Sequence, residues 1–139
     1  MPSVYITSVI PKECAEILQS KDFDIQVNQQ NRDLTKKELI DVFSKYDAVI
    51  PLMTDKIDRY VLSAASRKLK VVANYAVGFD NIDLVFAAKK NITVCNTPGA
   101  ASESVAEHTF LLIFACTKRI IEADKFVRLG KYQRWDPMA

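Results

Sequence analysis

The chain has 139 residues, a formal net charge of +2 and 49% apolar residues. This length predicts about one domain, with enough apolar residues to form a core. Acidic and basic residues are interspersed along the sequence and form no basic stripe, which argues against a nucleic-acid-binding surface. No apolar run is long enough to predict a membrane span, and no signal peptide is visible. We therefore expect a cytoplasmic protein.

Cysteine and histidine usage excludes two kinds of site. Cys14, Cys95 and Cys116 are widely spaced and form no CxxC pair, so we expect reduced and mostly buried thiols. His108 is the only histidine in the sequence, and a histidine-rich metal site is therefore excluded.

Strand and helix patterns alternate over the first 95 residues. Short apolar or β-branched runs predict five strands, at residues 4–10, 23–27, 47–52, 69–73 and 92–95. Helices are predicted between them, at residues 11–19, 34–45, 54–67 and 83–89. Thr35 and Glu38 form a capping-box pattern, and Thr54 or Asp55 is expected to cap the third helix. This alternation predicts an α/β fold with a doubly wound, parallel, five-stranded sheet.

A long apolar helix is predicted after the sheet. No proline or glycine occurs from Ser104 to Arg128, residues 110–116 are apolar on every side, and Gly130 is expected to end the helix. Such a helix needs cover on every side, and the elements before it are too few to supply that cover. We therefore place a boundary near Ala100 and expect a chain that has been cut short at Ala139.

The stretch from residue 71 to residue 83 is the strongest candidate for a binding loop. It predicts a strand, a tight loop at Gly78 and the start of a helix. Glycine lets a ligand approach the backbone closely, and N–H groups at the carboxyl end of a parallel strand suit a carboxylate. The alternative is an ordinary loop in which Asp80 or Asp83 caps the helix.

Three stretches in this order resemble the D-isomer-specific 2-hydroxyacid dehydrogenases: residues 72–83, 96–99 and 104–109. Residues 74–83 and 122–128 are most similar to the glyoxylate and hydroxypyruvate reductases of that family. Lactate-type and gluconate-type activities remain open. The phosphoglycerate branch carries a basic residue where this chain has Asn74, which argues against a phosphorylated substrate.

The resemblance implies two lobes and a nicotinamide cofactor, NAD or NADP. Residues 1–100 would form a flavodoxin-like substrate-binding lobe. Residues 101–139 would form a crossover helix and the start of a cofactor lobe. The sequence contains only three glycines, Gly78, Gly99 and Gly130, and they are too far apart to form a G-x-G-x-x-G motif. The cofactor is therefore expected to bind mainly to a missing C-terminal part.

The resemblance also assigns half of an active site. Val77 and Gly78 match the loop whose N–H groups hold the substrate carboxylate, and Leu52 and Met53 match a loop on the far side of the substrate. Ser104 matches a hydroxyl position that faces the cofactor. Each of two residues has an alternative interpretation. Leu52 could be an ordinary core residue at the end of a strand, and Ser104 could be a helix N-cap.

No catalytic residue is transferred to this chain, because the family's arginine, histidine and glutamate lie in the C-terminal half. His108 matches a structural histidine instead. We expect a fragment that is inactive alone, acts on small 2-oxo or 2-hydroxy acids and pairs into a homodimer through residues 104–128. The alternative is a stand-alone flavodoxin-like binding, regulatory or dimerisation module. The residues after its first strand, from Pro11 to Cys14, are not the loop that such a module would need.

Overall fold

The computed structural model describes residues 1–30 and 32–135. It divides into two compact units, Met1–Gly99 and a second unit that begins at Ala100. Each unit is described by itself.

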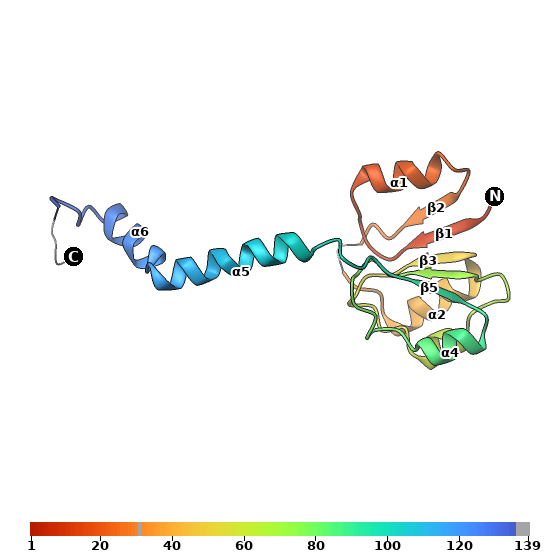
Figure 1. Cartoon of the computed structure of the whole chain (residues 1–139). Coiled ribbons are helices and arrows are strands. Elements are labelled where there is room, and N and C mark those ends of the chain that lie inside the picture. Colours follow the sequence, from red (N-terminus) through yellow and green to blue (C-terminus); the bar gives the residue numbers. More distant parts are fainter. Residues whose placement is uncertain (31, 136–139) are drawn as a thin grey trace. The chain divides into compact units, whose positions relative to one another are not determined.

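The first unit is built on a five-stranded parallel sheet with the strand order β2-β1-β3-β4-β5 (Figure 1). The strands are β1 (Ser3–Ile6), β2 (Asp24–Val27), β3 (Ala48–Ile50), β4 (Val71–Ala73) and β5 (Thr93–Cys95). The helices between them are α1 (Lys12–Gln19), α2 (Lys36–Lys45), α3 (Arg59–Ser63) and α4 (Leu84–Lys89). The predicted α/β class and the parallel sheet are confirmed.

The core lies between the sheet and the helices on one of its faces. α1 lies on one face of the sheet, whereas α2 and α4 lie on the other (Figure 1). Val49 and Val72 are partners in the β3–β4 register, so their side chains point to the same face. There they pack with Phe43 of α2 and Leu62 of α3, and all four are fully buried. Each such side chain contributes about 1.5–3 kcal/mol on burial.

The third helix is shorter than predicted. Asp58, not Thr54 or Asp55, caps it by accepting hydrogen bonds from the N–H groups of Tyr60 (2.9 Å) and Val61 (3.1 Å). The backbone just before Asp58 is extended, because Ile57 forms a parallel bridge with Ile82. A residue paired in this way cannot join a helix, and α3 therefore begins only at Arg59.

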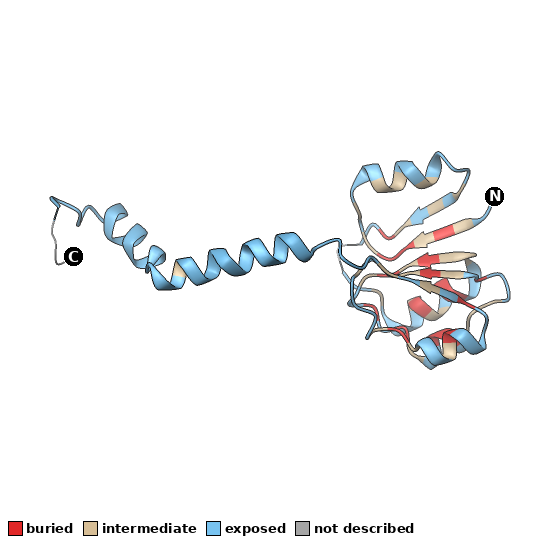
Figure 2. Ribbon diagram, in the orientation of Figure 1, coloured by how far each residue is buried: buried red, intermediate tan, exposed pale blue. Residues whose placement is uncertain are grey.

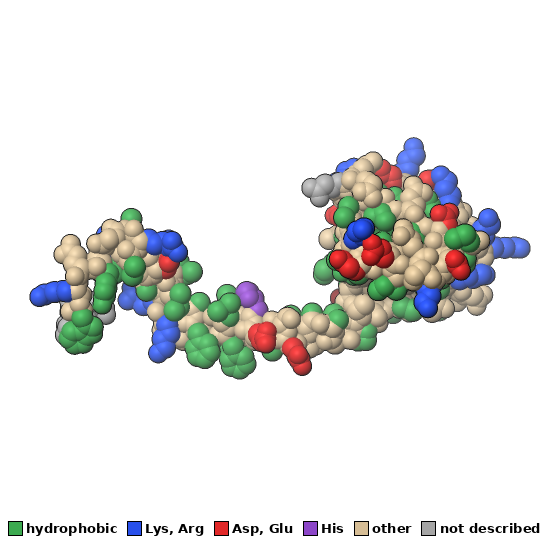
Figure 3. Space-filling view, turned by 90° about the horizontal axis from the view of Figure 1, so that it is seen from above, with side chains coloured by type: hydrophobic (Ala, Val, Ile, Leu, Met, Phe, Trp, Pro, Cys, Tyr) green, Lys and Arg blue, Asp and Glu red, His purple; other side chains and the backbone are tan. Residues whose placement is uncertain are grey.

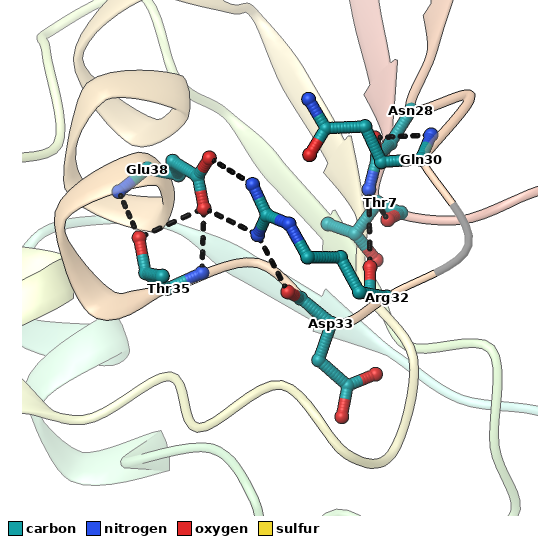
Figure 4. Close-up of polar contacts among 7 residues, drawn as sticks. All are labelled: Thr7, Asn28, Gln30, Arg32, Asp33, Thr35 and Glu38. Carbon is teal, nitrogen blue, oxygen red and sulfur yellow. Dashed lines mark hydrogen bonds and ion pairs between the residues drawn. The ribbon is translucent and has the colours of Figure 1, made fainter.

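The capping box of α2 is confirmed (Figure 4). The N–H of Glu38 donates to the Thr35 hydroxyl (3.3 Å), and the N–H of Thr35 donates to the Glu38 carboxylate (2.8 Å). Arg32 donates to both Glu38 carboxylate oxygens, at 2.9 and 2.6 Å, and this contact is the main reason that the pKa of Glu38 is lowered. The start of α2 is thereby tied to the loop that precedes it.

The predicted single helix over residues 104–128 is wrong, because the second unit contains two helices. α5 (Ser102–Thr117) and α6 (Ile120–Arg128) are separated at Arg119, whose φ of 49° is left-handed. A left-handed residue cannot continue a right-handed helix. Arg119 also donates a hydrogen bond to the Glu122 carboxylate in the first turn of α6. Gly130, with φ of 67°, follows the C-cap residue Leu129 of α6, as predicted for a helix end.

The apolar side chains of α5 are not covered by the described residues. From Phe110 to Phe114 every side chain is at least half exposed, and α5 and α6 are almost uniformly exposed in Figure 2. Apolar side chains line these helices in Figure 3. Within residues 1–30 and 32–135, no helix has both the length and the apolar content needed to cross a membrane.

The expectation of mostly buried cysteines is wrong. All three are free thiols, as expected, but Cys14 is half-buried and Cys95 and Cys116 are exposed. Cys95 lies on the edge strand β5 and Cys116 on the uncovered helix α5, which explains their exposure.

Candidate functional site

Buried polar side chains gather at the carboxyl edge of the sheet. Thr7 follows β1, Asn28 follows β2, Asn74 follows β4, and Asp55 lies in the loop after β3; all four are buried. In open parallel sheets, ligands bind beyond this edge. The candidate site is therefore sought among the loops that these side chains support.

The loop after β3 is fixed at the point where the strand order reverses, between β1 and β3. The Thr7 hydroxyl donates to the Asp55 carboxylate (2.5 Å), and the N–H of Leu52 donates to the same carboxylate oxygen (2.9 Å). Burial raises the pKa of Asp55, whereas these two hydrogen bonds oppose the rise. The backbone of Leu52 is thus connected through the Asp55 carboxylate to Thr7 at the end of β1.

The loop after β4 is anchored through its carbonyl groups. Three consecutive carbonyl oxygens accept hydrogen bonds from residues that follow β4 and β5. They are those of Ala76 (from the N–H of Thr97, 2.9 Å), Val77 (from Asn96 Nδ2, 2.7 Å) and Gly78 (from Asn74 Nδ2, 2.8 Å). The carbonyls of this loop therefore point toward the protein.

The N–H groups of the same peptides point the other way, because N–H and C=O are opposed in a trans peptide. They belong to Val77, Gly78 and Phe79. Among residues 1–30 and 32–135, these three N–H groups donate no hydrogen bond. Consecutive backbone N–H groups with this orientation suit an anion such as a carboxylate.

Gly78 is not required by the packing of its own unit. A Cβ built there would have the Asp80 carboxylate as its nearest neighbour, at 4.0 Å, and the positive-φ glycines are Gly99 and Gly130 instead. Neither a crowded backbone nor a left-handed turn explains the residue. Glycine at this position leaves the backbone of the exposed loop open to close approach.

The loops after β3 and β4 lie side by side. A parallel bridge joins Leu52 to Tyr75 beyond the ends of the two strands. Leu52 is half-buried and stands outside the core cluster of buried side chains, whereas Met53 is exposed. The apolar side chains of Met53, Tyr75, Val77 and Phe79 in these two loops are all exposed.

Ser104 does not cap its helix. It is the third residue of α5, whose N-cap position is Ala101 with no side-chain cap, so the N-cap interpretation of Ser104 is wrong. The Ser104 side chain is exposed in the second unit, and so is His108. In the first unit, Asp83 caps α4 by accepting from the N–H of Phe86 (2.9 Å), whereas Asp80 is exposed and does not cap.

Two hollows in the structure are lined by residues outside this loop. One of about 540 Å³ is lined by residues that include Tyr5, Gln26 and Tyr46, and the other, of about 520 Å³, borders α6. In the described part of the chain, no three His, Cys, Asp or Glu side chains gather in a way that could hold a metal ion.

Sequence reasoning missed the asparagines that support the loop. Asn74 and Asn96 directly follow β4 and β5, and Asn81 lies between the loop and α4. Asparagine often bonds backbone groups near strand ends and turns, and that tendency was the available signal.

The structure is thus an α/β unit with a five-stranded parallel sheet and a loop of backbone N–H groups at the carboxyl edge of that sheet. The family described as "D-isomer specific 2-hydroxyacid dehydrogenase, catalytic domain" matches residues 4–127, and the chain belongs to that family.

Relatives and solved structures agree with this assignment. The chain is 42% identical to a glyoxylate reductase of Aeropyrum pernix and 36% identical to one of Pyrococcus furiosus. These matches cover 99% and 98% of this chain but 42% and 41% of the relatives, so the chain spans about two fifths of their length.

Among solved structures, the TT0316 protein of Thermus thermophilus has a TM-score of 0.87 at 32% identity, over 97% of this chain and 43% of its own. A D-lactate dehydrogenase of Aquifex aeolicus, solved with NAD and lactic acid, has a TM-score of 0.74 at 26% identity, over 99% of this chain and 40% of its own.

Proposed function

We propose that residues 1–139 are the substrate-binding part of an NAD- or NADP-dependent enzyme that interconverts 2-oxo acids and D-2-hydroxy acids, with a glyoxylate- or hydroxypyruvate-like substrate. The observation that carries the proposal is the set of three outward N–H groups at Val77, Gly78 and Phe79. The carbonyl groups of the same three peptides accept hydrogen bonds from Thr97, Asn96 and Asn74. The donors are therefore already oriented before a carboxylate arrives. Such preorganisation is what binding a small anion from water requires.

Each loop has a separate role in the proposal. Val77 and Gly78 hold the substrate carboxylate. Leu52 and Met53 bound the far side of the substrate and limit its size, since the Leu52–Tyr75 bridge places that loop beside the donors. A 2-oxo acid as small as glyoxylate needs few further contacts.

The described residues do not provide a cradle for the dinucleotide. Gly78, Gly99 and Gly130 are too far apart in the sequence for a phosphate-binding loop, and Ser104 offers only a single hydroxyl. A nicotinamide supplies hydride when it is bound. We place its binding mainly in a C-terminal part, and we assign no catalytic residue to residues 1–139.

The two units are interpreted accordingly. Residues 1–100 form the flavodoxin-like substrate-binding lobe, and residues 101–139 form the crossover helix region and the start of a cofactor lobe. Ser104 faces the cofactor in this interpretation. We place the complete enzyme in the cytoplasm.

The exposed apolar side chains of the second unit support a homodimer through Ser104–Arg128. Phe110, Leu111 and Phe114 are each more than half exposed, and apolar surface of this extent marks an interface. Sedimentation of the 139-residue chain should show a species larger than a monomer. A monomer that does not bind a dye for apolar surfaces would contradict this.

The activity is tested on two proteins side by side. The 139-residue chain and the longest product of its reading frame are assayed with glyoxylate and hydroxypyruvate, each with NADH and NADPH. Reduction by the longer product alone supports the proposal. Turnover by the 139-residue chain contradicts it, because no catalytic group has been assigned there. Inactivity of both proteins toward both acids contradicts the substrate assignment.

A further inference from the structure

Two asparagine side chains form a reciprocal pair beneath the candidate site. Asn74 Nδ2 donates to Asn81 Oδ1 (3.0 Å), and Asn81 Nδ2 donates to Asn74 Oδ1 (3.2 Å). Asn74 is only 2% exposed, and Asn81 is half-buried. The pair is partly buried, so its hydrogen bonds are exchanged for bonds to solvent less readily than exposed ones.

Each member of the pair also holds one of the two substrate loops. Asn74 Nδ2 donates to the carbonyl of Gly78 (2.8 Å) in the loop after β4. Asn81 Nδ2 donates to the carbonyls of Leu52 (3.2 Å) and Asp55 (3.1 Å) in the loop after β3. The pair is therefore a direct polar connection between the two loops.

Only a carboxamide satisfies both positions. Each side chain must accept from its partner and also donate to its partner and to at least one backbone carbonyl. An aspartate at either position would set a carboxylate oxygen against a carbonyl oxygen, because a carboxylate has no donor. The chemistry of the pair thus depends on the amide groups and not on side-chain size alone.

We propose that Asn74 and Asn81 are positioning residues that couple the carboxylate-binding loop to the loop that limits substrate size. A shift of one loop is transmitted through the pair to the other, so carboxylate binding and size selection are set together. The identity of the ligand in this inference rests on the proposed function, whereas the coupling itself rests on the hydrogen bonds alone.

The coupling is tested by amide NMR spectra of the 139-residue chain without any ligand. In Asn81→Ala, amide resonances should move at residues 52–55, whose carbonyls Asn81 contacts directly, and also at residues 77–79, which its side chain reaches only through Asn74. Asp83→Ala is the matched control, because it removes the α4 cap two residues away and leaves the pair intact. Unchanged resonances in either loop of Asn81→Ala would overturn the proposal.

The functional consequence is tested with the longest product of the reading frame. Asn81→Ala should raise KM about tenfold for both glyoxylate and hydroxypyruvate, since a small displacement of binding groups is costly. The preference between the two acids should also weaken. Because the pair acts on binding, kcat should change less than KM, and Asp83→Ala should leave KM unchanged.

Conservative variants separate positioning from general destabilisation. Asn81→Gln keeps a carboxamide and should recover part of the affinity, whereas Asn81→Asp should recover none. Equal KM values for the wild type and Asn81→Asp would overturn the proposal. If the longest product reduces neither acid while both loops still respond in the spectra, the proposed function fails and the coupling stands.

Discussion

The two units of this chain use apolar residues in opposite ways. In Met1–Gly99, side chains such as Phe43, Val49 and Leu62 are sealed between a sheet and its helices, with no exposure at all. In the second unit, Phe110 and Leu111 are comparably apolar but remain 62% and 60% exposed. Apolar content alone does not make a core, because a second layer must be present to cover it. The first unit has that layer and the described second unit does not.

The units also differ in where polar groups are buried. In the first unit, Thr7, Asp55 and Asn74 lie below the surface, and within the described residues no buried side-chain polar atom lacks a hydrogen-bond partner. Asn74 fixes the loop that carries the N–H donors, and Thr7 and Asp55 fix the neighbouring loop after β3. In the second unit the described polar side chains are exposed. The candidate site therefore belongs to the unit that can hold a loop rigid from beneath.

The largest expected effect is on the stability of the first unit, and it should differ between substitutions in the two units. Phe43→Ala should lower the free energy of unfolding of the first unit by about 4 kcal/mol, because it leaves a cavity in a closed core. Phe110→Ala, the same substitution on the exposed helix, should leave that unit unchanged. Amide hydrogen exchange in β3 and β4 measures both. Similar losses of protection would mean that Phe110 is part of the same core.

Two glycines separate binding from folding. Gly78→Ala should leave the free energy of unfolding within about 0.5 kcal/mol of the wild type, since the new Cβ meets nothing closer than 4.0 Å. It should raise KM for a 2-oxo acid about tenfold in the longest product, by keeping the carboxylate away from the backbone donors.

Gly99→Ala is the control and should do the reverse. Its φ of 80° is left-handed, so a Cβ there should cost about 1–2 kcal/mol of stability. Urea unfolding gives the free energy of unfolding of each variant, and steady-state kinetics give its KM. A loss of stability in Gly78→Ala without loss of affinity would contradict the site.

The pH dependence of stability should differ in sign between Asp55 and Glu38. Burial raises the pKa of Asp55, so the folded chain holds that proton more tightly, and the contribution of Asp55 to stability falls as pH rises through its folded pKa. Asp55→Asn should therefore gain stability relative to the wild type between pH 3 and pH 7.

The contribution of Glu38 to stability should have the opposite pH dependence. Its pKa is lowered, mainly by the Arg32 hydrogen bond, so its contribution is present above the unfolded pKa and is lost as pH falls. Glu38→Gln should lose stability relative to the wild type between pH 3 and pH 7. Urea unfolding at both pH values checks both signs, and parallel trends for the two variants would contradict the assignment.

The smallest effect distinguishes the two aspartates of the loop. Asp83→Ala should cost about 1 kcal/mol of stability, because the N–H of Phe86 loses its acceptor. Asp80→Ala should cost nothing measurable, since Asp80 is exposed and caps no helix. Urea unfolding of both variants measures the difference. Equal costs would mean that the cap of α4 is shared.

Much of the first unit could be predicted from the sequence. Alternating apolar runs and caps such as Thr35 with Glu38 report on local structure, and they predicted the parallel sheet and the start of α2. The predicted start of α3 was wrong because Ile57 forms a parallel bridge with Ile82, which is distant in the sequence. The break at Arg119 was missed because no glycine or proline marks it.

The site was predicted only in part. Val77 and Gly78 were proposed as carboxylate donors, and the orientation of their peptides supports that proposal without testing it. The supporting pair, Asn74 and Asn81, was not foreseen. Their hydrogen bonds join loops from different strands, and such contacts depend on the assembled sheet and not on local pattern.

The most direct measurement is a titration of the isotopically labelled 139-residue chain with oxalate, a non-reacting acid close in size to glyoxylate. The amide resonances of Val77, Gly78 and Phe79 should move with the largest shifts, and Gly78→Ala should raise the oxalate concentration needed for half of the response about tenfold. Resonances that stay fixed in this loop, or that move instead in the hollow lined by Tyr5, Gln26 and Tyr46, would contradict the account.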